Sequence, residues 1–255
     1  MRVLMLGDIY GTVGRKLVKQ RLSSFQKEVA ADWVVANGEN ATGGAGLSPK
    51  HRDELFAAGI DILTSGNHIF GRPDWHDVVN DRTLRPHNIG GDGLPGRGWT
   101  LREKSGAGVL GVINLAGRVF LEPADCPFRW AEELLKRFPS GTPILVDFHA
   151  EATSEKIALS LYLDGKVALV AGTHTHVQTS DERILPGGTA SITDLGMTGP
   201  ENGIIGVEPG IVLDRFVKGY SDRFICAAGA GVIEGVVVDI DGSGKATRIE
   251  RIRIR

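Results

Sequence analysis

A chain of 255 residues is long enough to bury a substantial core, and α/β or layered sandwich domains of this size are often single. Its apolar fraction of 42% and charged fraction of 24% are ordinary for a soluble globular protein. The formal net charge of −2 gives no electrostatic footprint for duplex nucleic acid or an anionic membrane, whereas small nucleotides need only local positive charge.

The N-terminus and the two cysteines favour a cytoplasmic location. Met1 leads directly into a short strand pattern and lacks the long apolar core and small-residue cleavage site of a signal peptide. No apolar run approaches the ~18 residues that a membrane span needs. Cys126 and Cys226 form no CxxC motif, so we expect both to be buried free thiols in a reducing compartment.

The first part of the chain alternates between strand and helix patterns. Strands are predicted at 3–6, 33–36 and 60–63, and helices at 12–30, from Ser48-Pro49 to Gly59, and at 73–80. Ser48 is a predicted N-cap, Pro49 a first-turn proline and Gly59 a helix stop. This order indicates βαβ units.

The rest of the chain contains more antiparallel patterns. After a Gly/Pro-rich loop at 86–98, we predict hairpin strands at 99–103 and 109–115, a helix at 127–138, a strand at 143–147, a helix at 154–161 and a strand at 167–171. Further along come a hairpin at 182–193, a Gly-rich loop at 194–210, a helix at 211–217, and a last hairpin at 230–254 with one wet face. No repeat or linker interrupts the chain, so residues 1–255 are predicted to form one domain.

Five of the predicted strands end in the same way, with a small residue and then side chains that can bind metals. These side chains are Asp8, Glu39 with Asn40, Asn67 with His68, His149, and His174 with His176. In extended geometry the last two histidines, at positions i and i+2, would point to the same side. Because ligands collect at the carboxyl ends of strands in open α/β sheets, we expect all five groups to converge.

The number of these groups indicates more than one metal ion. A structural zinc needs only four ligands and favours cysteine, whereas two ions that share the Glu39 carboxylate fit the larger set. The mixture of oxygen and imidazole ligands suits iron, manganese or zinc. His51, His76 and His87 lack such partners and are expected to be surface or packing residues.

The motifs resemble those of the calcineurin-like metallophosphoesterases, and most closely those of the bacterial YmdB-like subfamily. They are Gly7-Asp8, Gly38-Glu39-Asn40, Gly66-Asn67-His68, Asp147-Phe-His149-Ala-Glu151 and Gly172-Thr-His174-Thr-His176-Val-Gln-Thr179, and Thr193–Pro200 also looks similar. The resemblance extends over essentially the whole chain. It implies an α/β fold of four layers, a metallophosphoesterase sandwich in which two mixed β-sheets are flanked by helices.

The resemblance also implies roles for individual residues. One metal would be held by Asp8, Glu39, Asn40 and His176, and the other by Glu39, Asn67, His149 and His174. Tyr10 stands where the wider superfamily has its first histidine, and Asn40 looks like the replacement. His68 would be catalytic, by giving a proton to the leaving oxygen or stabilising its charge. Asp147, Glu151 and Asp181 are expected to orient the histidines.

The implied activity is that of a dinuclear-metal phosphodiesterase with two divalent ions per chain, iron or manganese before zinc. It would hydrolyse 2′,3′-cyclic nucleotides, with 3′,5′-cyclic AMP as a second candidate, by attack of a metal-bridged hydroxide on phosphorus. The alternatives are a broad phosphomonoesterase and a slow-turnover regulator that senses nucleotides or RNA. The resemblance leans towards a homo-oligomer. Tyr10, Phe70 and Trp75 are candidates for stacking on a base, with core packing the favoured interpretation.

Overall fold

The computed structural model describes residues 1–255, and its strands form two mixed sheets. The first sheet contains β1 (Arg2–Leu6), β2 (Asp8–Ile9), β3 (Trp33–Asn37), β4 (Ile62–Thr64), β11 (Met197–Pro200), β12 (Gly231–Ile240) and β13 (Ala246–Ile254). Its order is β2-β11-β12-β1-β3-β4, with β13 paired to β12. The second sheet contains β5 (Trp99–Lys104), β6 (Gly108–Ala116), β7 (Ile144–His149), β8 (Leu169–Thr173), β9 (Arg183–Ile184) and β10 (Ala190–Ile192). Its order is β5-β6-β7-β8-β10-β9.

The α-helices are α1 (Gly11–Glu28), α2 (Pro49–Ala57), α3 (Trp75–Val78), α4 (Pro127–Leu135), α5 (Thr153–Tyr162) and α6 (Pro209–Lys218). Short 3₁₀ helices span Asn67–Gly71 and Gly91–Gly93. As predicted, the Ser48 side chain caps α2 by accepting a hydrogen bond from the His51 N–H. None of the helices combines the length and the apolar character that a membrane span requires.

Both faces of the central strands of the first sheet are buried. In β1, Val3 and Met5 face the second sheet, whereas Leu4 and Leu6 face the other way and pack with Val18 of α1 and other helix residues. This follows from the alternation of side chains along a strand, which sends neighbouring residues to opposite faces. Such strands read as continuous apolar runs.

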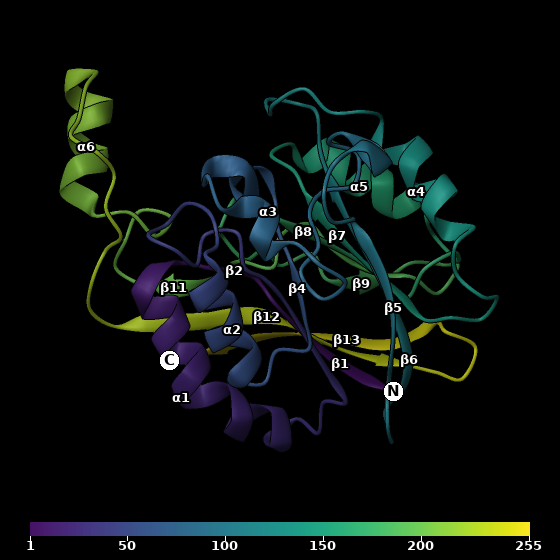
Figure 1. Ribbon diagram of the computed structural model, residues 1–255. Coiled ribbons are helices and arrows are strands. Elements are labelled where there is room, and N and C mark those ends of the chain that lie inside the picture. Colours follow the sequence, from purple (N-terminus) through teal and green to yellow (C-terminus); the bar gives the residue numbers. More distant parts are fainter.

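The second sheet repeats this arrangement. Leu110 and Val112 of β6 face the first sheet, while Ile113 and Leu115 pack with residues of α4 and α5, among them Leu134. Figure 1 shows α1 and α2 on one side of the molecule and α4 and α5 on the other. The predicted order of helices, sheet, sheet and helices is therefore confirmed.

The parallel strands bring their carboxyl ends to one edge, and the predicted site residues lie at or just after these ends. β1, β3 and β4 are parallel in the first sheet, and β6, β7, β8 and β10 are parallel in the second. Asn37, Thr64, His149 and Thr173 are the last residues of β3, β4, β7 and β8. The Asn37 amide donates a hydrogen bond of 3.1 Å to Asp147, so the two sheets meet at these strand ends.

Two predictions for the later part of the chain were wrong. Residues 197–200 lie in the predicted loop but form β11, which pairs with both β2 and β12. The predicted wet face of the last hairpin is confined to β13, because β12 is buried nearly throughout between the second sheet and α1. Elsewhere the element boundaries differ from the predictions by a few residues at most.

The segment 208–225, which we call the α6 arm, projects from the body of the molecule (Figure 1). Its two ends are joined where Val207 and Cys226 form an antiparallel bridge. Near the base, Val212 packs with Tyr10, Met197 and Val207 in a small cluster. The outer part of the arm is open, with Leu213, Phe216, Val217 and Tyr220 exposed.

Candidate metal centre

The centre of the site is a trio of side chains from three strand ends, two of them buried and the third, His174, partly buried. The ligating atoms of Glu39, His149 and His174 all lie within 4.8 Å of one another. Nε2 of His149 is 3.1 Å from Oε1 of Glu39 and 3.0 Å from Nδ1 of His174. Glu39 and His149 have no exposed side-chain surface.

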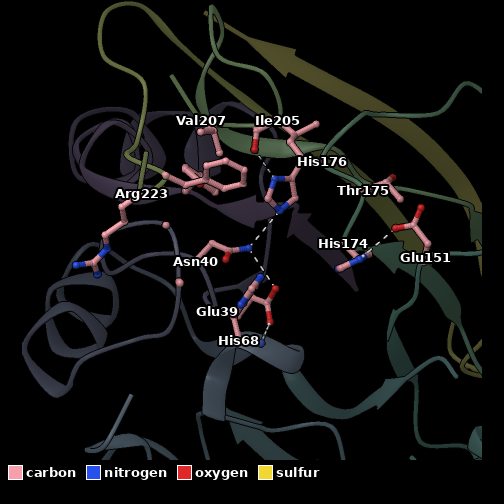
Figure 2. Close-up of a pocket in the computed structure, with 15 residues that line it drawn as sticks. Glu39, Asn40, His68, Glu151, His174, Thr175, His176, Ile205, Val207 and Arg223 are labelled. Atoms are coloured by element: carbon pink, nitrogen blue, oxygen red, sulfur yellow. Dashed lines mark hydrogen bonds and ion pairs between the residues drawn. The ribbon is translucent and has the colours of Figure 1, made fainter. Parts of the chain in front are cut away.

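A second group lies on the other side of Glu39. Oε1 of Glu39 accepts a hydrogen bond of 3.2 Å from Nδ2 of Asn40, which is also 3.2 Å from Nε2 of His176. That imidazole nitrogen lies 3.6 Å from Oδ1 of Asp8. Glu39 thus contacts both groups, and Figure 2 shows it between His68 and Asn40.

Asn67 and His68 complete the predicted set from one short 3₁₀ helix. Oδ1 of Asn67 lies 3.1 Å from Nε2 of His149, and its amide donates to Glu122 over 3.3 Å. The backbone N–H of His68 donates to Oε2 of Glu39 over 2.9 Å, while its imidazole makes no hydrogen bond and faces a pocket. All the residues predicted to bind metal therefore meet at one place, with the His68 ring beside them.

The donor atoms fit a cation. Oδ1 of Asp8 and Oδ1 of Asn40 are buried and have no hydrogen-bond partner. A buried oxygen without a partner is costly unless another group satisfies it. Both atoms belong to the group around His176, and carboxylate and amide oxygens beside imidazole form a ligand set for first-row divalent metals.

His149 and His176 are each held from outside the centre through Nδ1, while Nε2 of each ring points into it. Nδ1 of His149 lies 2.9 Å from the Thr173 hydroxyl, which donates to Asp147 and can therefore accept from the ring. Nδ1 of His176 donates to the Ile205 carbonyl over 2.8 Å. Nε2 of both rings is therefore the atom turned towards the site, and a neutral imidazole binds a metal through such a nitrogen.

His174 is held from the opposite direction. Its Nε2 atom lies 3.2 Å from the Glu151 carboxylate (Figure 2). Its Nδ1 atom lies 3.0 Å from Nε2 of His149. The predicted orienting roles of Asp147 and Glu151 thus agree with the contacts. Asp181 instead accepts hydrogen bonds from Thr179 and Thr193 and makes no contact with the histidines, so the prediction for it was wrong.

The expected extended geometry of His174 and His176 was also wrong. Strand β8 ends at Thr173, and the two histidines follow it with φ angles of +101° and +63°. Positive φ is uncommon for residues other than glycine and needs support from the surroundings. The two rings still reach the site, but through a turn.

A buried ion pair supports this turn. Nζ of Lys156 lies 2.8 Å from Oδ2 of Asp194, and the two side chains are 2% and 1% exposed. The same oxygen accepts hydrogen bonds from the backbone N–H and the hydroxyl of Thr175, between the two histidines. Sequence reasoning missed both residues, although Asp194 lies in the quoted stretch Thr193–Pro200.

The charges around the centre favour an added cation. Burial opposes ionisation of Asp8, but His176 outweighs it and holds the pKa of that carboxyl well below its usual range. Burial lowers the pKa of His149, but the Glu39 carboxylate outweighs it and raises this pKa to about 9. The buried carboxylates are thus stabilised by neighbouring positive charge, a role that a bound cation can take over.

The remaining predicted residues lie elsewhere or pack as expected. His87 is buried against Trp130, His51 contacts Thr42, and His76 is exposed. Phe70 and Trp75 pack against each other. Tyr10 is the exception among the stacking candidates, because it lines the pocket and meets His176 edge-on.

A pocket of about 530 Å³ opens above the centre. Its inner wall includes Glu39, Asn40, His68, His174 and His176. Sequence reasoning did not find the outer wall, which includes Ile205, Val207, Arg223 and Phe224 from the α6 arm and its base. A cavity of this size can hold a small phosphoester.

The chain is similar over its whole length to known proteins. A family model described as YmdB-like protein matches residues 4–252. The chain is 46% identical over 258 residues to a 2′,3′-cyclic-nucleotide 2′-phosphodiesterase of Bacillus subtilis, with 100% of this chain and 97% of the relative covered.

Solved structures show the same architecture. A crystal structure described as a novel phosphatase from Mycoplasma pneumoniae superposes with a TM-score of 0.93 at 35% identity, covering 100% of this chain and 93% of the other. A 5′-nucleotidase precursor from Thermus thermophilus superposes with a TM-score of 0.59 at 14% identity, covering 100% and 54%. The second similarity concerns the fold alone, which is that of the metallophosphoesterases.

Proposed function

The chain belongs to the YmdB-like family and is a phosphoric ester hydrolase, and we propose that it acts as a phosphodiesterase on 2′,3′-cyclic nucleotides. The observation that carries this proposal is the cluster of Glu39, His149 and His174, whose ligating atoms lie close together beneath an open pocket. The name of the Bacillus subtilis relative supports the choice of ester.

The metallophosphoesterase fold implies divalent metal ions, and we propose two of them, bound on either side of Glu39. Asp8, Asn40 and His176 would complete one binding site, and Asn67, His149 and His174 the other. The unpartnered oxygens of Asp8 and Asn40 and the contacts of Glu39 with both groups support this division. The donor set suits iron or manganese, with zinc as the alternative.

Two bound cations would lower the pKa of a water between them and neutralise the phosphoryl oxygens. The residues of the chain supply the rest. The Ile205 carbonyl and the Thr173 hydroxyl fix the ring orientations of His176 and His149. His68, whose imidazole faces the pocket, would donate a proton to the leaving 2′ oxygen, a contribution typically worth about 10²–10⁴-fold.

A direct turnover assay tests the proposal. The protein, purified with Mn²⁺ or Fe²⁺, is offered 2′,3′-cyclic AMP, 3′,5′-cyclic AMP and p-nitrophenyl phosphate. We expect 2′,3′-cyclic AMP to be the best substrate and 3′-AMP to be the product. The name of the Mycoplasma structure favours a second candidate, a phosphomonoesterase, and much faster hydrolysis of p-nitrophenyl phosphate would select it.

Absence of turnover with every metal would instead select a regulator that senses nucleotides or RNA. As a control, Asn67→Ala should lose metal and activity together, because the Asn67 amide oxygen faces Nε2 of His149 in the proposed second site. Metal analysis of the purified protein would show which ion is native.

Two further parts of the proposal concern the state of the protein in the cell. Cys126 and Cys226 are free, as predicted, but they are partly buried and not fully buried as expected. Free thiols suit a reducing cytoplasm. The exposed apolar side chains of the α6 arm suit a homo-oligomer. Sedimentation velocity of the purified chain would measure the oligomeric state.

A further inference from the structure

The pocket has two chemically different walls. The inner wall carries the carboxylate, amide and imidazole groups of the candidate metal centre, where a phosphoryl group would sit. The outer wall carries an aromatic ring, Phe224, and a guanidinium, Arg223, next to Ile205 and Val207. In Figure 2, Arg223 lies on the opposite side of the pocket from Glu151. A phosphoester held at the inner wall would extend its organic part towards this outer wall.

Phe224 is an apolar ring that remains 48% exposed at the pocket. The guanidinium of Arg215, from α6, lies over the ring at 5.9 Å from its centroid. A cation on one face of an aromatic ring supports the orientation of that ring. An exposed and supported ring of this kind is a stacking platform for a nucleobase, because every base offers a π-face.

Arg223 is the only lysine or arginine that lines the pocket. Its guanidinium makes no hydrogen bond or ion pair with any group of the chain. The single phosphate of a 2′,3′-cyclic nucleotide would bind at the inner wall. The Arg223 guanidinium would therefore remain available for a second anionic group. Guanidinium groups bind phosphate through paired donors. On a nucleotide, the second anion would be a phosphate on the 5′ oxygen.

We propose that Phe224 and Arg223 form a nucleoside subsite, in which the base stacks on Phe224 and Arg223 binds a phosphate on the 5′ side. The substrate class is then a ribonucleotide that bears both a 2′,3′-cyclic phosphate and a 5′-phosphate. This inference rests on the proposed function, because it needs the cyclic ester at the metal centre. It assigns the recognition of the substrate to the α6 arm.

The test compares esters with and without a base. Glycerol 1,2-cyclic phosphate has the same five-membered cyclic diester as 2′,3′-cyclic AMP but no base. In Phe224→Ala, we expect kcat/KM for 2′,3′-cyclic AMP, relative to that for glycerol 1,2-cyclic phosphate, to fall by about 5- to 100-fold, mainly through KM. Phe224→Trp should restore the ratio. Phe216→Ala is the matched control, since Phe216 is 82% exposed on the same arm and does not line the pocket.

The role of Arg223 is tested with a 5′-phosphate. The wild-type enzyme should have a lower KM for 5′-phosphorylated 2′,3′-cyclic AMP than for 2′,3′-cyclic AMP, and Arg223→Gln should remove most of this difference. Arg129→Gln is the control, because Arg129 is an exposed arginine on α4 that does not line the pocket. Equal KM values for the two esters in the wild type would overturn the assignment of Arg223.

Binding gives a readout that does not depend on turnover. Phe224→Ala should raise the Kd of 3′-AMP and not that of inorganic phosphate, measured by calorimetry on the metal-loaded protein. If the wild type hydrolyses both cyclic esters and Phe224→Ala changes neither the activity ratio nor this Kd, the subsite is wrong while the proposed function stands. If the wild type hydrolyses no ester, the proposed function fails, and unchanged 3′-AMP binding in the variant would overturn the subsite separately.

Discussion

Oε1 of Glu39 and Nε2 of His149 lie 3.1 Å apart at the meeting point of the two sheets, and neither side chain is exposed to solvent. Burial of such a pair costs several kcal/mol per ion, and their mutual attraction rarely returns more. Stability alone therefore does not account for it. The arrangement of the pair is explained if both side chains are ligands of a bound cation.

Replacement of Glu39 tests this view. Glu39→Gln removes the charge that both halves of the site share, so we expect the loss of bound metal and a decrease in kcat/KM of at least about 100-fold. Metal content by mass spectrometry and steady-state kinetics measure the two effects. Glu133→Gln, at an exposed position on α4, is the control. Full metal content in Glu39→Gln would contradict the shared-ligand role.

His68 should behave differently from the ligands. In His68→Ala we expect unchanged metal content and a decrease in kcat of about 10²–10⁴-fold for 2′,3′-cyclic AMP, because the leaving alkoxide loses its proton donor. Esters of p-nitrophenol, a better leaving group, should lose less. His76→Ala, at an exposed histidine, is the comparison. Loss of metal in His68→Ala would make His68 a ligand and refute the assignment.

The close approach of Gly66 to His149 leads to a third prediction. A Cβ atom at Gly66 would lie 2.1 Å from Cδ2 of the His149 ring, a distance that real side chains do not tolerate. Gly66→Ala should displace the ring, with a loss of about 1–3 kcal/mol of stability and a larger proportional loss of bound metal. Gly71→Ala is a matched control, since nothing lies within 4 Å of its Cβ position. Denaturant unfolding and metal analysis distinguish the two variants.

The ion pair of Lys156 and Asp194 should be essential to the turn that it supports. Lys156→Met leaves a buried carboxylate without its partner, so we expect a loss of about 3–5 kcal/mol in the free energy of unfolding. Lys166→Met, which breaks a 3.4 Å contact between exposed side chains, should cost less than about 1 kcal/mol. Urea unfolding measures both. Equal losses in the two variants would show that burial of the pair is unimportant.

His87 gives a pH-dependent prediction away from the metal centre. Burial against Trp130 lowers the pKa of His87 to about 4, whereas an unfolded chain takes up the proton near 6.5. Between these values the unfolded state binds more protons, so stability falls as the pH drops. His87→Asn, whose side chain can still accept the Gly98 N–H, should lose less stability between pH 7 and pH 5. His76→Asn should follow the wild type.

The strand order and the side chains that converge at the strand ends could be predicted from local patterns, and the four-layer sandwich from the resemblance to a known family. Apolar runs with polar residues at their ends locate parallel strands and place Asp8, Glu39 and His149 at one edge. The short strand β11 could not be found in this way. Met197–Pro200 contains a glycine and a proline, and it becomes a strand only through pairing with β2 and β12.

The residues of the outer wall of the pocket could not be predicted from the sequence for a similar reason. Arg223 and Phe224 follow α6 in a stretch without periodicity, and only the fold of the arm brings them to the pocket. The turn at His174 and His176 depends on Asp194 and Lys156, which lie elsewhere in the sequence. Local propensity favours an extended chain there, and tertiary contacts override it.

The α6 arm joins the body through the bridge between Val207 and Cys226 and a small apolar cluster, whereas His149 ends a strand at the centre of a six-stranded sheet. Amide hydrogens of the arm should therefore exchange with solvent much faster than those of β7. Substitutions in the arm should also change the free energy of unfolding only slightly. Substitutions confined to the arm could therefore change the substrate specificity of a relative and leave the catalytic reaction the same.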